Sequence, residues 1–196
     1  MSRLITDQNN YGPKKIQSGA QMTDEISQSM KGKFLLAIPG LPDPNFAQTV
    51  TCMCEHNESG ALGFIVNKVH PLLTGSELFE DLKITCNKSV DKLEIYLGGP
   101  VQPSGVFVLH GPPFNWNESL KIADWLALSN SRDILEAIAQ QKGPDSFMIL
   151  LGCAGWAPLQ LDNEMYDAAW LSSPVTEEIL FSTETQFKYE KAMMMI

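Results

Sequence analysis

The sequence predicts one α+β (mixed α/β) domain, and three observations carry that prediction. Two short strand-like segments, joined by a polar turn, lie between Val50 and Asn67 and require antiparallel pairing. Helix start and stop signals alternate with further apolar segments along the rest of the chain. The 196 residues are 44% hydrophobic and 19% charged, which is enough for one sizeable core and favours one domain over two small ones.

The N-terminal part of the chain differs from the rest in composition and in its lack of apolar periodicity. Residues 1–31 are polar, rich in Gln, Ser and Asn, and lack apolar periodicity, so they predict a flexible extension before a domain at 32–196. That domain opens with a short buried strand at 34–38. The three prolines of Pro39-Gly-Leu-Pro-Asp-Pro44 cannot continue it and predict a surface loop.

The segment between Val50 and Asn67 is the predicted centre of the fold. Its first half alternates with the two-residue period of a strand, the residues 56–60 supply turn chemistry, and 62–66 is an apolar run typical of a buried strand. We expect the rest of the chain to pack around this hairpin.

After the hairpin, Thr74 and Glu77 match a capping box and predict a helix that buries Leu78, Phe79 and Leu82. The residues 119–129 fit a strand or a helix, and we favour the strand. Further strands are predicted at 93–97, 106–110 and 147–151. Further helices are predicted at 130–142, after a tight turn at 152–158, from Ser173-Pro174 onward, and at 187–195.

Charge and composition restrict the class of protein. The formal charge is −9, from 14 basic and 23 acidic residues, which argues against direct nucleic-acid binding by the acidic body. We see no apolar run of about 20 residues and no secretory h-region, and the four cysteines are unequally spaced. We therefore expect a cytoplasmic protein with reduced thiols that does not enter a membrane. A monomer or weak homo-oligomer with an unknown protein partner is the expected state.

Two patterns in the sequence could indicate a reactive site, one a metal site and the other a cysteine nucleophile. Cys52, Cys54 and His56 are predicted to share one face of a strand, but a regular strand separates the first from the last by about 13 Å, too far for one zinc ion. Cys153 lies among glycines like the nucleophile of a hydrolase elbow, yet Leu151 occupies the position where that motif has glycine. We expect structural cysteines, no catalytic residue, no metal and no cofactor.

Polar residues, glycines and one tryptophan at strand ends and at a helix start form the candidate interaction or pocket set. These residues are Glu55, His56, Asn57, Asn67, Gly98, Gly99, Pro100, His110, Arg132, Asp133, Gly155 and Trp156. Sheet proteins often bind ligands at such strand ends. For the glycines, tight turns are the stronger interpretation, and for Arg132-Asp133 an internal ion pair.

Taken together, several motifs make the chain resemble the YqgE/AlgH family of bacterial proteins. They are Phe34-Leu-Leu-Ala-Ile-Pro39 with Asp43-Pro44, Cys54-Glu-His-Asn57, Gly60-Ala-Leu-Gly63 with Asn67, Leu97-Gly-Gly-Pro-Val101, Val106-Phe-Val-Leu-His110, Ser131-Arg-Asp133, Gly152 with Ala154-Gly-Trp156, Gln160-Leu161 and Trp170-Leu171. The resemblance implies a single compact domain with a mixed, bifurcated β-sheet flanked by helices. It implies no established enzymatic activity. It implies a regulatory role, because some members of the family are linked to the control of exopolysaccharide genes.

Two functional hypotheses follow. The first is a non-enzymatic cytoplasmic regulatory or protein-interaction domain, which would act on transcription through a protein partner. The alternative is a small-molecule binder or a Cys/His hydrolase that uses a pocket near His56, Asn57, His110 and Trp156.

Overall fold

The structure is a computed structural model that describes residues 29–38 and 46–196. Residues 1–28 of the predicted extension and the whole predicted proline loop, 39–44, lie outside the described residues. The strands are β1 Lys33–Ala37, β2 Val50–Asn57, β3 Gly60–Ile65, β4 Val69–Thr74, β5 Glu94–Leu97, β6 Val101–His110, β7 Leu120–Ala123, β8 Leu126–Ser129, β9 Phe147–Trp156 and β10 Trp170–Pro174. The helices are α1 Gly75–Asp81, α2 Arg132–Ala139, α3 Gln160–Tyr166 and α4 Lys188–Met193, with short helical turns η1 Lys88–Lys92, η2 Glu178–Ser182 and η3 Thr185–Phe187.

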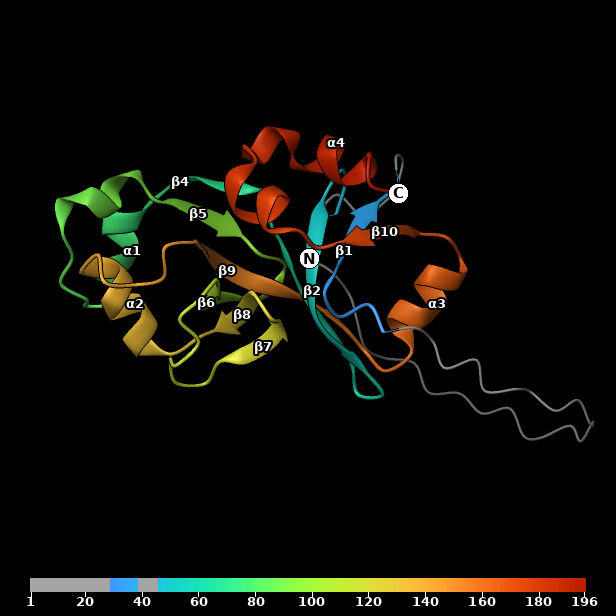
Figure 1. Ribbon diagram of the computed structural model, residues 1–196, viewed down its shortest axis with the longest axis horizontal. Coiled ribbons are helices and arrows are strands. Elements are labelled where there is room, and N and C mark those ends of the chain that lie inside the picture. The colour runs from blue at the N-terminus through green and yellow to red at the C-terminus, as the bar shows by residue number, and fades with distance from the viewer. Residues whose placement is uncertain (1–28, 39–45) are drawn as a thin grey trace, which may run out of the picture.

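Strand β9 is the centre of the sheet (Figure 1). One of its edges pairs with β6, and its other edge pairs first with β5, in parallel, and then with β3, antiparallel. The sheet therefore forks at this edge: the main path runs β10-β1-β2-β3-β9-β6-β8-β7, and β4 and β5 form a side arm. The bifurcated mixed sheet implied by the family resemblance is confirmed. The expected centre was the β2–β3 hairpin, but β9 is the strand that joins all parts.

Three glycines make the fork possible, because the backbone of 98–99 crosses that of β9 at close range. Gly98 donates its N–H to the Leu151 carbonyl at 2.7 Å and accepts from the Ile65 N–H at 2.8 Å. Gly99 and Gly152 both have positive φ, +151° and +70°. A Cβ on either one would clash with the backbone of the opposite segment.

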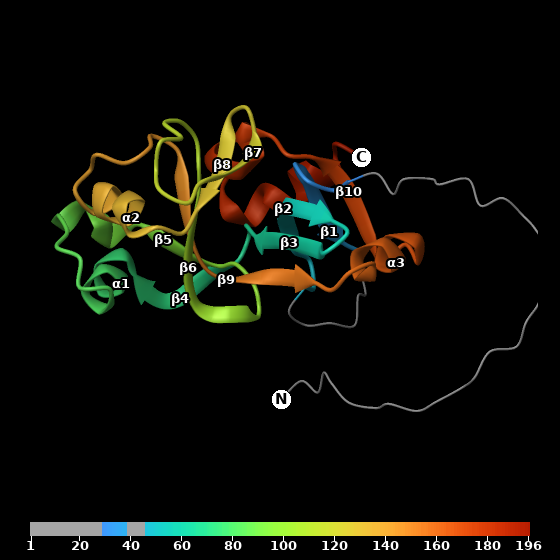
Figure 2. The same ribbon diagram turned by 90° about the horizontal axis from the view of Figure 1, so that it is seen from below.

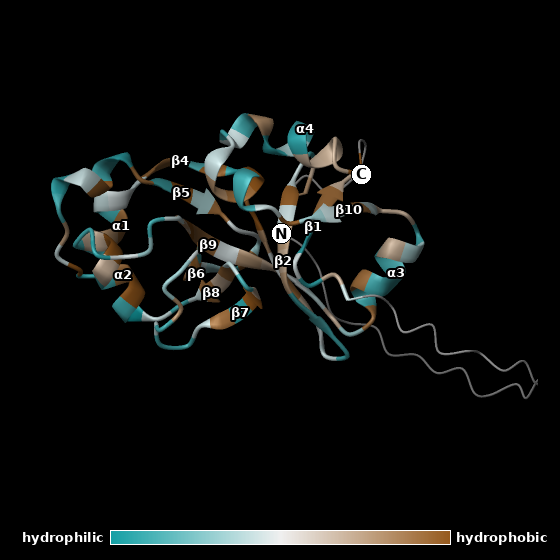
Figure 3. Cartoon of the chain, viewed as in Figure 1, coloured by the Kyte–Doolittle hydropathy of each residue, from teal (hydrophilic) through white to brown (hydrophobic). Residues whose placement is uncertain are grey.

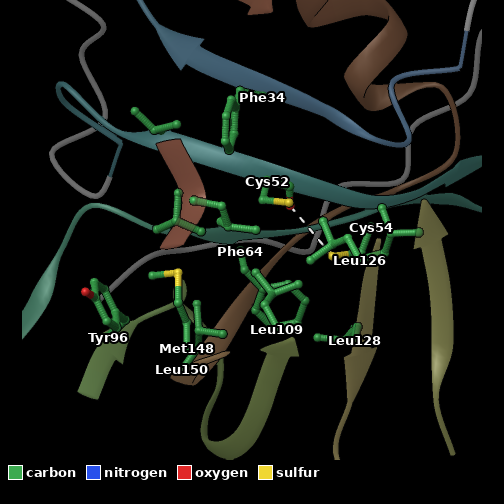
Figure 4. Packing of buried hydrophobic residues seen from close by; sticks show 14 of the residues in the cluster. Phe34, Cys52, Cys54, Phe64, Tyr96, Leu109, Leu126, Leu128, Met148 and Leu150 are labelled. Atoms are coloured by element: carbon green, nitrogen blue, oxygen red, sulfur yellow. Dashed lines mark hydrogen bonds between the residues drawn. The ribbon is translucent and has the colours of Figure 1, made fainter. Parts of the chain in front are cut away.

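The forked sheet separates three hydrophobic cores, and alternate side chains of a strand enter different cores. The central core lies among β1, β2, β3, β6, β8 and β9 and is closed by η2 and α4; Figure 4 shows its side chains converging between the strands. A second core lies between α1, α2 and the strands β5, β6 and β9. The third lies beneath α3, which Figure 2 shows at the opposite end of β9 from α1 and α2. In Figure 3 the helices carry both hydrophilic and hydrophobic segments, as expected where one face is buried.

The locally signalled elements are confirmed. The capping box is present, since Thr74 accepts from the Glu77 N–H while Glu77 accepts from the Thr74 N–H. The α2 helix buries Ile134, Leu135 and Ile138 as predicted. The strand assignment for 119–129 is confirmed, but the segment is a hairpin of two strands, β7 and β8.

Two predictions near the C-terminal end are wrong. The tight turn predicted at 152–158 is the second half of β9, because β3 and β6 supply backbone partners on both edges. The helix predicted from Ser173-Pro174 is preceded by β10, which pairs with β1 over residues 170–174 and so includes both residues. Pro174 is the last residue of a strand that pairs on one side, where a missing N–H is tolerated.

Candidate functional site

A pocket of about 390 Å³ lies between β5, the start of β9 and the segment that joins η2 to α4. Its walls include Glu94 and Tyr96 of β5, Met148 of β9, Thr185 of η3 and Lys188 of α4. Tyr96 and Met148 also belong to the central core, and Figure 4 shows them beside each other there. The pocket therefore opens directly beside the core.

Lys188 is the unusual residue of this pocket, because a lysine occupies a position that is only 2% exposed. Its Nζ donates to the Leu180 carbonyl at 2.8 Å, contacts the Met148 sulfur at 3.7 Å, and lies 5.2 Å from the centre of the Tyr96 ring. Leu180 belongs to η2, a single π-helical turn, and such turns are frequent at functional sites. Lys188 thus has polar and aromatic contacts but forms no ion pair with a described carboxylate.

Burial lowers the pKa of Lys188 from 10.5 to about 8, although the charge of Glu94 opposes this shift. Burial, together with a hydrogen bond to Glu94, raises the pKa of Tyr96 to about 12. The Tyr96 hydroxyl donates to the Glu94 carboxylate at 2.6 Å and lies 3.2 Å from the Thr185 hydroxyl. Near neutral pH Tyr96 is therefore a phenol and Lys188 is mostly an ammonium group.

Asn67 borders a second pocket of about 450 Å³, which shares Thr185 and Gln186 with the first. The Asn67 side chain accepts from the Val50 N–H at 2.8 Å and donates to the Gln48 carbonyl at 2.9 Å. These contacts fix the start of β2, so the side chain shapes the pocket wall through the backbone it holds.

His56 does not share a face with the two cysteines, contrary to prediction. A β-bulge between Met53 and Glu55 adds one residue to β2, which turns the following side chains to the other face. Cys52 and Cys54 pack in the central core, whereas His56 Nε2 lies 3.3 Å from Asp162 of α3. Its Nδ1 accepts the Met30 N–H at 3.1 Å, so in this arrangement the proton is on Nε2. His56 ties residues before β1 to α3.

Trp156 lies on the same face as His56, since both residues pair with Ala61 across β3. Its indole N–H donates to Glu164 at 2.9 Å, and the indole of Trp170 donates to the same carboxylate oxygen at 2.8 Å. Both rings are buried beneath α3. Trp156 therefore packs in the core beneath α3.

His110 is fully buried at the other end of β9, where it pairs with Phe147. Nine residues of β9, roughly 30 Å along a strand, separate this pair from Trp156, so the two imidazoles do not share a pocket. His110 Nδ1 lies 2.7 Å from the Gly111 carbonyl and Nε2 lies 2.9 Å from the Ser129 hydroxyl. Burial lowers the pKa of His110, against a weaker opposite effect of the bond to Gly111.

The other candidates at strand ends have backbone roles or point outward. Asn57 accepts the Ser59 N–H at 2.8 Å and shapes the hairpin turn. Gly98 and Gly99, followed by Pro100, form the fork of the sheet described above. Gly155 is exposed and pairs with Leu62, the residue that also pairs with Glu55.

Arg132 and Asp133 stabilise neighbouring helices. The Arg132 guanidinium donates to the Leu82 and Lys83 carbonyls at 3.1 and 3.0 Å, at the C-terminal end of α1. Burial raises the pKa of Asp133, but hydrogen bonds from Ser131 and from backbone N–H groups lower it more, so the net pKa is lowered. The ion pair that Arg132 forms is with Glu136, not with Asp133.

Replacing Arg132 by alanine should lower the free energy of unfolding by about 1 kcal/mol, because two carbonyls at the end of α1 lose their donors. Urea unfolding followed by circular dichroism measures this change. Lys121→Ala is the control, since Lys121 pairs only with exposed Asp124, and it should show no measurable change. Equal stability of the Arg132 variant and the parent would contradict the proposed role.

Sequence reasoning missed the residues of the Lys188 pocket. One local signal was present: Lys188 and Ala192 are four residues apart on the buried face of α4, so a charged residue stands on an apolar stripe. Glu94, Tyr96 and Thr185 carry no such signal, because their proximity depends on the fold. Among residues 29–38 and 46–196, no three His, Cys, Asp or Glu side chains gather as a metal-binding group. No helix in that part of the chain is long and apolar enough to cross a membrane.

Residues 34–196 match the profile of a protein family described as AlgH-like. A UPF0301 protein of Desulforapulum autotrophicum is 70% identical over 173 residues, which are 88% of this chain and 92% of that protein. A UPF0301 protein of Nitrosococcus oceani is 43% identical over 164 residues, which are 83% and 87% of the two chains.

Two solved structures are similar in fold. The solution structure of the AlgH protein from Pseudomonas aeruginosa has a TM-score of 0.77 and 37% identity, and the match covers 92% of each chain. A crystal structure from Corynebacterium diphtheriae has a TM-score of 0.66 and covers 83% of this chain and 84% of that one. Its 20% identity makes this second likeness one of fold alone.

Proposed function

The chain belongs to the AlgH-like family, and from that premise we propose that it is a non-enzymatic regulatory domain that binds a small molecule beside Lys188. The single observation that carries this proposal is a buried lysine among the residues that line the 390 Å³ pocket. A buried cation without a carboxylate partner costs folding free energy. A ligand that pairs with Lys188 offsets that cost, which gives the residue a function.

The groups that could perform nucleophilic chemistry support binding rather than catalysis. Burial raises the pKa of Cys153, and burial raises that of Cys54 further, so both thiols remain protonated and weakly nucleophilic at neutral pH. His56 and His110 use both ring nitrogens in internal contacts and lie at opposite ends of β9. These features support a scaffold that holds a ligand without transforming it.

We further propose that the regulatory effect passes through a protein partner in the cytoplasm. The charge of −9 disfavours direct contact with the phosphates of nucleic acid. The four cysteines are free thiols, which agrees with a reducing compartment. The resemblance to a family with regulatory members supports the same role, and a monomer or weak homo-oligomer would leave surfaces of the domain available to the partner.

Chemical-shift mapping tests the ligand-binding proposal. The full chain is titrated with a panel of small carboxylates, primary amines and amino acids at pH 7. At least one class should shift the backbone amide resonances of Tyr96, Thr185 and Lys188, and the variant Lys188→Met should abolish these shifts. Lys191→Met, an exposed lysine on the same helix, is the matched control and should keep them. Shifts confined to other regions, or retained in the Lys188 variant, would contradict the proposal.

A further inference from the structure

We propose that the Lys188 pocket binds a small zwitterion of the α-amino acid class, with the ligand carboxylate facing Lys188 and the ligand ammonium group facing Glu94. This inference rests on the proposed function, because it names the ligand class for the same pocket. It follows from the charges on the pocket walls and from how those charges are paired.

Opposite charges line this pocket without pairing with each other. The polar contacts of Lys188 are the Leu180 carbonyl and the Met148 sulfur, while the Glu94 carboxylate accepts from the Tyr96 hydroxyl. The two groups interact electrostatically, yet they form no ion pair. A ligand that carries both charges can pair with both walls at once.

Ligands of a single charge fit this arrangement less well. A simple carboxylate can face Lys188, but it brings a third negative charge beside Glu94 and Glu184, which both line the pocket. A simple amine can face the carboxylates, but it brings a second positive charge towards Lys188. Each case places like charges together, and such contacts select against a ligand. A zwitterion adds no net charge.

The remaining lining indicates a polar ligand of modest size. Ser182, Thr183 and Gln186 also line the pocket; the Thr183 hydroxyl donates to the Glu178 carbonyl and the Gln186 amide to Glu184. The volume of about 390 Å³ is at the small end of the range typical of small-molecule sites. A single polar amino acid satisfies both conditions.

Isothermal titration calorimetry of the full chain with three matched probes tests the assignment. The probes are L-glutamine, 4-carbamoylbutanoate, which lacks the amino group, and 4-aminobutanamide, which lacks the carboxylate. L-Glutamine should bind roughly tenfold more tightly than either analogue, because only it pairs with both walls.

Two variants locate the two charges of the ligand. Lys188→Met and Glu94→Gln should each weaken L-glutamine binding roughly tenfold, and the glutamine of the second variant still accepts from Tyr96. Glu190→Gln, in the neighbouring pocket, is the matched control and should leave the affinity unchanged. Circular dichroism shows whether each variant is folded.

The outcomes separate this inference from the function on which it rests. If 4-carbamoylbutanoate binds as tightly as L-glutamine and still requires Lys188, the pocket takes an anion: the zwitterion is wrong and small-molecule binding stands. Unchanged affinity in Glu94→Gln overturns the assignment of the ammonium group. Failure of all three probes overturns the inference, while the wider panel above decides the proposed function by itself.

Discussion

Replacing Lys188 by methionine is expected to raise the free energy of unfolding at pH 7 by about 2 kcal/mol. The lowering of the Lys188 pKa from 10.5 to about 8 corresponds to roughly 3 kcal/mol of penalty for the charged form in the folded chain. Methionine removes that penalty, because its uncharged side chain is similar in length to that of lysine and suits an apolar environment. It also leaves the Leu180 carbonyl without its donor, which costs about 1 kcal/mol.

The pH dependence of stability follows from the same shift. Below pH 8 both the folded and unfolded chains hold the proton on Lys188, so the folded chain bears the full penalty. Between pH 8 and 10.5 the unfolded chain holds more protons than the folded chain, so the contribution of Lys188 to stability rises with pH. The stability advantage of Lys188→Met over the parent should therefore become smaller as the pH rises from 8 to 10.5.

The measurement is the difference in free energy of unfolding between parent and variant, by urea unfolding at several pH values. A difference is needed because the buried thiols of Cys54 and Cys153 titrate in the opposite sense, and Tyr96, with its pKa of about 12, also lowers stability above pH 10. Lys191→Met is the control and should show no measurable change at any pH. The prediction is wrong if Lys188→Met is less stable than the parent and if the difference in free energy of unfolding stays constant between pH 8 and 10.5.

Replacing Gly152 by alanine is expected to lower the free energy of unfolding by about 4 kcal/mol. The φ of +70° places this residue in the left-handed region, which costs a residue with a Cβ about 1–2 kcal/mol. The added Cβ would also clash with the Gly99 carbonyl, an atom of the backbone that cannot move aside as a side chain can. Relieving that clash requires the fork of the sheet to open, at a further cost of about 1–3 kcal/mol.

Gly155→Ala is the matched control for this experiment. It lies on the same strand, three residues away, and the nearest atom to its added Cβ is a Val101 methyl at an ordinary 3.8 Å. Its stability should stay within about 0.5 kcal/mol of the parent. Similar stabilities of the two alanine variants would show that the backbone crossing at Gly152 is not tight. Loss of folded protein for Gly152→Ala alone would agree with the prediction.

The comparison of these two glycines also explains what sequence reasoning identified and what it did not. Both glycines belong to the predicted turn 152–158, and the local sequence does not distinguish one from the other. Their difference depends on what lies across from each residue: the Gly99 backbone for one and open space beside Val101 for the other. No pattern within β9 reports the identity of its neighbours.

The sequence by itself determined the elements whose signals are local. The Thr74–Glu77 capping box, the apolar face of α2 and the β2–β3 turn depend on residues a few positions apart, and all were predicted. Hydrogen bonding and side-chain spacing within one segment decide such features. The roles of the candidate residues depended on partners from other segments: Gly155 and Trp156 lie within β9 instead of a turn, and Arg132 pairs with Glu136 instead of Asp133.

The tertiary structure alone decided the features that depend on distant partners. Strand β9 continues past Gly152 because β3 and β6 supply backbone groups, the bulge in β2 turns His56 towards α3, and β10 forms because β1 offers an open edge. The Lys188 pocket depends on β5, β9 and α4, and more than 30 residues of the chain separate each of these elements from the next. Burial and the approach of charges from other segments set the chemistry of that lysine, and a local pattern contains neither.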